Sequence, residues 1–222
     1  MDKKNLGAAP VDIQWRVESW FPELGEANLR KLKILRDELF RFNKAINLIS
    51  VKTIPMTDLI HFADSILACR LIHNSKKPTE IYDFGSGNGF PGLIYALLYP
   101  STTVRLVESD QRKAEFIRHA ASSLQLKNVD VMVRLVESLP DKSIQFAMAR
   151  GLASISKTVL MSRKCFKKGG IFFHIKSEEW ATEVADIPSQ LCSHWLPSLV
   201  GEYKLPVGSV KFAVVSTEKI AD

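Results

Sequence analysis

The chain has 222 residues, of which 46% are hydrophobic, and its formal net charge is +6 at pH 7. This size supports one well-buried domain with an appendage and argues against two full domains. The three cysteines form no C-x-x-C pair and have no histidine at metal-ligand spacing, so disulfide frameworks and metal sites both lack support.

Charge and hydropathy bear on partners and location. Excess cationic charge attracts polyanions, which favours RNA or DNA as a macromolecular partner, although many proteins of similar charge bind neither. The segment Met1–Asn5 has no apolar run behind its charges, and no stretch approaches the roughly 20 apolar residues of a membrane span. We therefore expect a soluble cytoplasmic protein that does not bind membranes.

Two or three helices are predicted ahead of the first strand. After Pro55, Thr57 is expected to cap a helix whose apolar face begins at Leu59. An earlier amphipathic helix with a largely basic exterior has apolar residues at three- and four-residue steps: Leu29, Leu32, Leu35, Leu39 and Phe42. Together these helices form a predicted extension over residues 1–78, which packs on a domain of residues 79–222 so that the two make one continuous unit.

Strands and helix-length segments alternate from residue 80 onward. Lys167–Gly170 is interpreted as a basic helix end with a glycine stop, and the run Val210–Val215 suggests a closing hairpin at the sheet edge. The alternation predicts an α/β fold with a mostly parallel sheet and helices on both faces. The predicted strands are Ile81–Phe84, Thr103–Val107, Val129–Val133, Ile144–Ala149 and Gly170–Ile175.

A glycine-rich loop follows the first predicted strand. It reads Asp83-Phe84-Gly85-Ser86-Gly87-Asn88-Gly89-Phe90-Pro91-Gly92. Glycines at this density let the backbone turn sharply and approach a ligand closely, and a helix behind them directs free N–H groups toward the same space. The segment therefore predicts a cofactor-binding loop, since a purely structural turn needs fewer glycines and no carboxylate.

The acid in this loop bears on which cofactor is bound. The spacing after Gly87 satisfies G-x-G-x-x-G, but a carboxylate beside the pyrophosphate of NAD would repel it. S-adenosyl-L-methionine has no phosphate, and Asp83 can hold its ammonium group while amides of the loop face its carboxylate. We therefore expect this cofactor at Asp83, Gly85, Gly87 and Gly89, and we rank NAD-dependent oxidoreduction last.

A second acid follows at the end of the next strand. Glu108 lies twenty-three positions after Gly85 and directly after Thr103–Val107. In a strand-helix-strand unit this spacing places a carboxylate where it can accept hydrogen bonds from both ribose hydroxyls. The alternative is a solvated glutamate that opens a helix.

The segment Asp83–Gly89 together with Glu108 resembles the first two motifs of class I S-adenosylmethionine-dependent methyltransferases. That resemblance implies a Rossmann-like fold with a seven-stranded, mostly parallel sheet. Further segments resemble the RsmG (GidB) family of bacterial enzymes, which methylate guanine N7 in small-subunit ribosomal RNA, at guanine 527 in standard 16S numbering. These segments, within a match from about Leu29 to Lys176, are Gly89–Gly92, Asn43–Ser50, His61–Ser65, Val136-Glu137, Arg150 and Lys176.

The family resemblance also implies roles for individual residues. It implies that Gly85 and Phe90 contact the cofactor, that Val136 and Glu137 border its adenine, and that Arg150 lies beside the methyl-donor pocket. The positions of these residues in the predicted sheet agree with such roles. Val136-Glu137 follows the third predicted strand and Arg150 lies at the end of the fourth, at the edge where open α/β sheets bind ligands. An ion pair with a neighbouring acid is the alternative for Arg150.

Three positions depart from the family pattern. Leu135 stands where an arginine is common, with Arg134 one place earlier; Ile60 replaces an arginine, and Ser177 replaces a glycine. These departures leave cofactor binding intact but bear on how RNA is engaged.

The implied reaction needs no general base, because guanine N7 carries a lone pair and no proton. The enzyme must align nitrogen, methyl and sulfur, an effect that can supply roughly 7–11 kcal/mol in favourable intramolecular systems. His61 and Asp64, three residues apart on a predicted helix, could position the base or brace each other. Cationic residues that could hold RNA phosphates are Lys44, Arg112, Lys113 and Lys176.

Two functions compete with methylation of ribosomal RNA. The chain could be an RNA-binding ribosome-assembly protein without methyltransferase activity, or it could be a methyltransferase for small molecules. The leading hypothesis predicts small-subunit ribosomal RNA, or the assembled small subunit, as partner of a monomeric enzyme.

Overall fold

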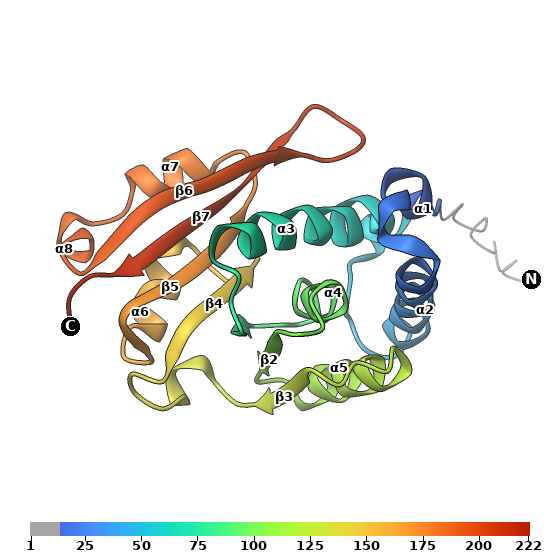
Figure 1. The fold of residues 1–222 in the computed structure, drawn as a ribbon, viewed down its shortest axis with the longest axis horizontal. Coiled ribbons are helices and arrows are strands. Elements are labelled where there is room, and N and C mark those ends of the chain that lie inside the picture. Colours follow the sequence, from blue (N-terminus) through green and yellow to red (C-terminus); the bar gives the residue numbers. More distant parts are fainter. Residues whose placement is uncertain (1–13) are drawn as a thin grey trace, which may run out of the picture.

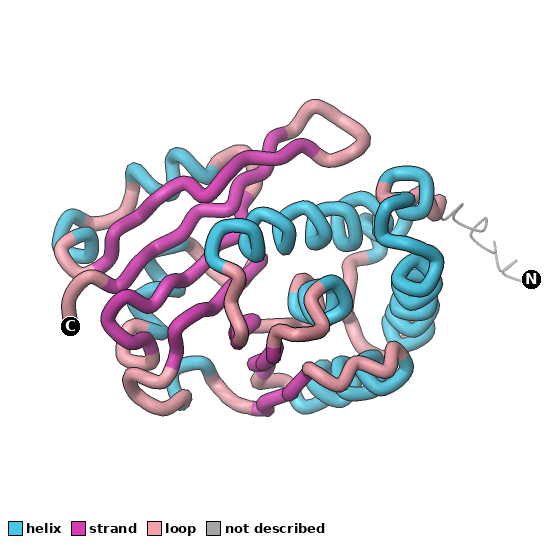
Figure 2. The backbone as a smooth tube through the Cα atoms, viewed as in Figure 1, coloured by secondary structure: helices cyan, strands magenta, loops and turns pink. Residues whose placement is uncertain are grey.

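The structure is a computed structural model that describes residues 14–222, and these form a central sheet between two layers of helices (Figure 1). Within that range the sheet has seven strands in the order β3-β2-β1-β4-β5-β7-β6. Figure 2 shows the strands of this sheet in magenta beside the cyan helices. The strands are β1 (Glu80–Phe84), β2 (Thr103–Glu108), β3 (Val129–Val133), β4 (Ile144–Arg150), β5 (Phe166–Lys176), β6 (Trp195–Lys204) and β7 (Lys211–Lys219).

The sheet is parallel except at one edge. β1 to β5 run in the same direction, β7 is antiparallel to β5, and β6 is antiparallel to β7. The predicted fold and its closing hairpin are therefore confirmed. In a parallel sheet all carboxyl ends meet at one edge, and this edge carries the functional site.

Helices cover both faces of the sheet (Figure 1). On one face lie α1 (Val17–Trp20), η1 (Pro22–Leu24), α2 (Gly25–Asn43), η2 (Val51–Met56), η3 (Asp58–Ala63), α3 (Asp64–Lys76), α4 (Gly92–Leu98) and α5 (Gln111–Ser123). The other face and its edges carry η4 (Val136–Ser138), α6 (Ile155–Ser162), α7 (Trp180–Ala185) and α8 (Ser189–Cys192). None of the described helices has the length and apolar composition needed to span a membrane.

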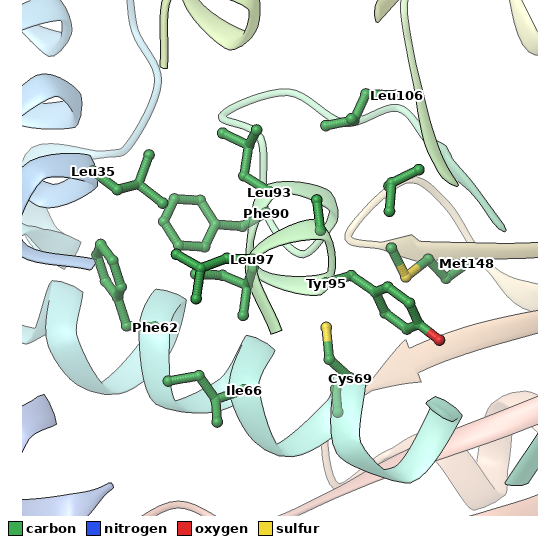
Figure 3. Packing of buried hydrophobic residues seen from close by; sticks show 14 of the residues in the cluster. Leu35, Phe62, Ile66, Cys69, Phe90, Leu93, Tyr95, Leu97, Leu106 and Met148 are labelled. Atoms are coloured by element: carbon green, nitrogen blue, oxygen red, sulfur yellow. The ribbon is translucent and has the colours of Figure 1, made fainter. Parts of the chain in front are cut away.

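Strand residues alternate between two hydrophobic clusters. In β5, Phe172 packs toward α6 and Phe173 toward α3, and neighbours in β1 and β7 divide in the same way. This period of two is what a pleated strand buried on both faces requires. The larger cluster joins the N-terminal helices to the sheet, and Figure 3 shows Leu35, Phe62 and Phe90 packed beside α4. The predicted division between residues 1–78 and 79–222 stays a prediction, but one core serves both.

The expected helix end at Lys167–Gly170 is wrong. α6 ends at Ser162, and β5 already begins at Phe166. The glycines belong to an irregularity in the β4–β5 pairing, where Gly169 has a φ of +77° and its carbonyl accepts from Gln145 Nε2 at 2.8 Å. Glycine is favoured where φ is positive, both in a β-bulge and just after a helix. The glycine pattern therefore does not distinguish a bulge from a helix end.

The expected N-cap at Thr57 is also wrong. Thr57 already has helical dihedrals, and its hydroxyl donates backward to the carbonyl of Ile54 at 2.8 Å. The chain passes from η2 directly into η3, a π-helical segment, and then into α3 without a break. π-helical turns frequently occur at functional sites, and η3 contributes His61 to the cavity described below.

The shared core generates a stability prediction. Leu35 is fully buried on α2, so Leu35→Ala should lower the free energy of unfolding by about 2–5 kcal/mol, and it should do so in one cooperative transition. Ile34 on the same helix is 36% exposed, and Ile34→Ala should cost much less. Urea denaturation followed by circular dichroism measures both. Two separate transitions in the wild-type protein would contradict a single core.

Candidate functional site

A cavity of about 860 Å³ lies at the carboxyl edge of the parallel strands. Its lining comes from the glycine loop after β1, the ends of β2, β4 and β5, and the junction of η3 with α3. Of the predicted site residues, the lining contains Gly85, Gly87, Phe90, Glu108, His61, Asp64, Arg150, Lys113 and Lys176. A second cavity of about 580 Å³ is lined largely by α6, α8 and the chain end, and it contains none of them.

The glycine loop is anchored to the neighbouring strand. The amides of Gly85 and Ser86 both donate to the carbonyl of Val107, at 2.9 and 3.2 Å. Gly85 has a φ of +67°, and a Cβ added there would lie 2.6 Å from Leu152 Cδ1. These two amides are therefore used inside the protein, and the expectation that amides of the loop face a ligand carboxylate stays a prediction. The loop offers instead a close-fitting backbone surface.

Glu108 is held in place by two backbone amides. Its Oε2 accepts from Gly87 N and its Oε1 from Asp110 N, both at 2.8 Å. The side chain is mostly buried and lines the cavity. Each carboxylate oxygen retains a lone pair, so Glu108 can still accept hydrogen bonds from a bound diol. Its placement matches the predicted ribose contact.

Asp83 lies behind the glycine loop and does not line the cavity. It is fully buried, and Oδ2 accepts from Gly92 N at 3.0 Å, at the start of α4. Burial raises the pKa of Asp83 to about 7, against hydrogen bonds that act in the opposite direction. Within residues 14–222 its Oδ1 has no hydrogen-bond partner. The expected contact between Asp83 and an ammonium group stays a prediction.

Arg150 is the centre of a buried polar cluster at the cavity wall. Its Nη1 donates to the carbonyl of Ile60 at 2.8 Å and to Asp64 Oδ2 at 3.0 Å. Its Nη2 lies 3.2 Å from His61 Nδ1. Burial and the charge of Arg150 lower the pKa of His61 to about 3, so the ring is neutral at physiological pH. Nδ1 then accepts from Arg150, and Nε2 carries the proton.

The chain matches the family model for GidB, rRNA small subunit methyltransferase G, over residues 28–199. The chain belongs to this family. It is 56% identical over 215 residues to ribosomal RNA small subunit methyltransferase G 3 of Bdellovibrio bacteriovorus, which covers 96% of this chain and 97% of that protein. It is 29% identical over 206 residues to ribosomal RNA small subunit methyltransferase G of Halorhodospira halophila, with 91% and 97% covered.

Solved structures agree on the fold. A SAM-dependent methyltransferase from Aquifex aeolicus matches with a TM-score of 0.54 at 15% identity, covering 70% of this chain and 91% of that one. A predicted O-methyltransferase from Agrobacterium tumefaciens matches with a TM-score of 0.54 at 19% identity, covering 71% and 81%. As a GidB family member, the chain is a methyltransferase that uses S-adenosyl-L-methionine.

The family residues after β3 do not reach the cavity lining. Val136 is buried against the α6 side of the sheet, and Glu137 is exposed. Both lie in η4, so their expected contact with adenine stays a prediction. Leu135, which departs from the family pattern, is 56% exposed. By contrast, Ile60 and Ser177, the other two departures, do line the cavity.

The four predicted cationic residues differ in their position and in their partners. Lys176 is already paired, because its Nζ lies 2.8 Å from Glu183 Oε2 and donates to the carbonyl of Ala153. Lys113 lines the cavity and forms no ion pair with any residue between 14 and 222. Lys44 is exposed beyond α2 and outside the lining, and Arg112 donates to the carbonyl of Ala45 at 2.6 Å.

Several lining residues carry no sequence signal. Leu152 follows β4 and packs on Gly85, and Phe212 reaches the cavity from the β6–β7 hairpin. Glu183 enters from α7. Only the glycine after Arg150, Gly151 with a φ of +65°, could have marked the loop that brings Leu152 to the site.

The buried carboxylate of Asp83 generates a pH prediction. Its pKa is raised in the folded state, so the folded protein binds more protons than the unfolded chain between about pH 4 and 7. The stability that Asp83 gains by protonation is therefore lost as pH rises through this window. Relative to Asp83→Asn, the wild-type free energy of unfolding should fall by up to about 1.4 kcal/mol per pH unit. Urea titrations from pH 5 to 8 measure this difference.

A matched control is Asp110→Asn at the N-cap of α5. Hydrogen bonds from the amides of Lys113 and Arg112 lower the pKa of Asp110, so its carboxylate stays charged from pH 5 to 8. That variant should be destabilised evenly across the range. If the wild-type and Asp83→Asn curves ran parallel, the burial of a titrating Asp83 would be refuted.

Proposed function

We propose that the chain transfers a methyl group from S-adenosyl-L-methionine to N7 of one guanine in 16S ribosomal RNA, at guanine 527 in standard numbering. The observation that carries the proposal is the cavity at the strand ends, built from the glycine loop, Glu108 and the Arg150 cluster in a GidB family chain. The target atom and position follow from the resemblance to that family.

The residues of the cavity fit the cofactor. A volume of about 860 Å³ falls in the range of small-molecule sites. Among the acids that line the cavity, Glu108 has free lone pairs that suit a ribose diol. An acid at this position would suit the ribose of NAD as well, so membership of the GidB methyltransferase family is what favours S-adenosyl-L-methionine over NAD. We assign Gly85, Gly87, Gly89, Phe90 and Arg150 to the same site.

The chain's contribution to the chemistry is orientation and charge balance. S-adenosyl-L-methionine supplies a methyl group carried on a positively charged sulfur. Guanine N7 needs no deprotonation, and His61 and Asp64 are both committed to Arg150. Because positive charge passes to the guanine ring during transfer, Asp64 has a second effect: it neutralises Arg150, which would otherwise repel the methylated base.

Access to RNA is proposed to depend on Lys113 and its surroundings. Lys113 borders both the main cavity and a smaller depression of about 250 Å³, which Arg112, Asp110 and residues 45–47 also line. Unpaired cations beside a cofactor cavity can hold the phosphates around a base that is turned out of its stack. Lys44 lies near the same loop, whereas Lys176 braces Glu183. We further propose that the enzyme acts in the cytoplasm as a monomer.

The proposal predicts one defined product. Small ribosomal subunits incubated with the purified protein and S-adenosyl-L-methionine should gain one N7-methylguanine, mapped by mass spectrometry of 16S fragments. Gly85→Arg should abolish the methylation, because the new side chain would fill the cavity and collide with Leu152. Gly25→Arg is the matched control: its φ is also positive, but nothing lies within 4 Å of the added Cβ. Methylation that survives in Gly85→Arg, or no methylated guanine with wild type, would contradict the proposal.

A further inference from the structure

A tyrosine from the C-terminal hairpin reaches the polar cluster around Arg150. Tyr203 Oη donates to Asp64 Oδ1 at 2.6 Å, across 139 positions of sequence. The other oxygen of Asp64 accepts from Arg150. A continuous chain of hydrogen bonds thus joins β6 to α3 and α3 to the end of β4. Tyr203 itself is absent from the cavity lining and lies beyond the residues matched by the family model.

The backbone of β6 explains how Tyr203 reaches Asp64. The pairing with β7 shifts register between Leu199 and Gly201, and such a bulge changes the face to which the following side chains point. At Gly201 an added Cβ would lie 3.2 Å from Leu71 Cδ2, so a side chain there would hold β6 away from α3. Two residues later Tyr203 projects toward α3, and its ring stacks on Phe212 with centroids 5.8 Å apart.

Asp64 depends on this contact because it is almost completely buried. A buried carboxylate is costly unless its oxygens are hydrogen-bonded, and here Tyr203 and Arg150 each partner one oxygen. Burial, together with the charge of Asp64, raises the pKa of Tyr203, so the phenol keeps its proton and acts as a donor. Loss of that donor would leave Oδ1 unpaired and free Asp64 to rotate.

We propose that Tyr203 is a positioning residue for the methyl-donor site: through Asp64 it holds the Arg150 guanidinium in the orientation that contacts the cofactor. The proposal rests on the proposed assignment of Arg150 to that site. Among residues 14–222, Asp64 is the carboxylate that pairs with Arg150, whose side chain is 16% exposed and lines the cavity; the carbonyl of Ile60 and the ring of His61 also hold the guanidinium. A shift of Asp64 would therefore change the orientation of Arg150, and Asp64 is held from the opposite side by the hairpin.

The test is calorimetric binding of S-adenosyl-L-homocysteine and S-adenosyl-L-methionine to the full-length protein. Tyr203→Phe keeps the ring that stacks on Phe212 and removes only the hydroxyl. It should raise Kd about 5- to 10-fold. Asp64→Ala removes both acceptor oxygens and so breaks the same link from the other side, and it should raise Kd at least as much. Tyr99→Phe removes a hydroxyl from a ring stacked on His73 and should leave Kd unchanged.

A double-mutant cycle separates positioning from general destabilisation. If Tyr203 acts through Arg150, Tyr203→Phe should have no further effect on Kd in the Arg150→Ala background. Its effect on the melting temperature of the cofactor-free protein should persist, because Asp64 still loses a partner. Circular dichroism establishes that each variant is folded.

The outcomes separate this inference from the proposed function. A wild-type protein without affinity for either ligand would contradict both. Measurable wild-type binding with an unchanged Kd in Tyr203→Phe, or a full effect of Tyr203→Phe on Kd when Arg150 is already alanine, would overturn the inference alone. An unchanged Kd in Arg150→Ala would overturn it as well, since Tyr203 would then have no route to the cofactor.

Discussion

The site depends on the attachment of the glycine loop to the end of β2. β1 and β2 pair in parallel, with Phe84 opposite Val107, so both strands end at the same level. The carbonyl of Val107 accepts two loop amides and the carboxylate of Glu108 accepts a third. These bonds fix the floor of the cavity and orient Glu108 in one step. Glycines are needed because the loop must turn with positive φ and pass close to Leu152.

The walls of the cavity include segments that lie outside the parallel strands. η3 and α3 contribute His61 and Asp64, and the β6–β7 hairpin contributes Phe212. Tyr203 of the same hairpin lies behind this lining and donates to Asp64. Arg150, at the end of β4, is the point where these segments meet. A buried ion pair contributes little net stability by itself, because desolvation offsets its Coulombic gain. The ion pair instead helps to fix the orientation of Arg150, since the guanidinium is held by several hydrogen bonds with defined directions.

Much of this arrangement was predictable from the sequence, and the failures have identifiable causes. The strands and the glycine loop follow from local patterns of two-residue alternation and glycine spacing. Glu108 was predictable because the strand-helix-strand unit has a regular length. The position of Asp83 outside the lining could not be predicted, because a pattern gives position along a strand but not which face of the loop a carboxylate occupies. A bulge at Gly169 and a helix end cannot be distinguished by the glycine pattern, since both need a glycine with positive φ.

Tyr203 could not have been found by such reasoning. Its role depends on a register shift in β6 and on the packing of that strand against α3, which are long-range features without a local signature. The same holds for the π-helical turn that carries His61, because it continues α3 without any capping signal. Residues that act through tertiary hydrogen bonds are the part of a site that sequence reasoning leaves out.

The most direct test of this account is a crystal structure of the protein with S-adenosyl-L-homocysteine. The account predicts that the ligand occupies the cavity at the strand ends, with its ribose hydroxyls within hydrogen-bond distance of Glu108 and its amino-acid end near Arg150. A ligand bound in the cavity beside α6 and α8, or a ribose that makes no contact with Glu108, would contradict it.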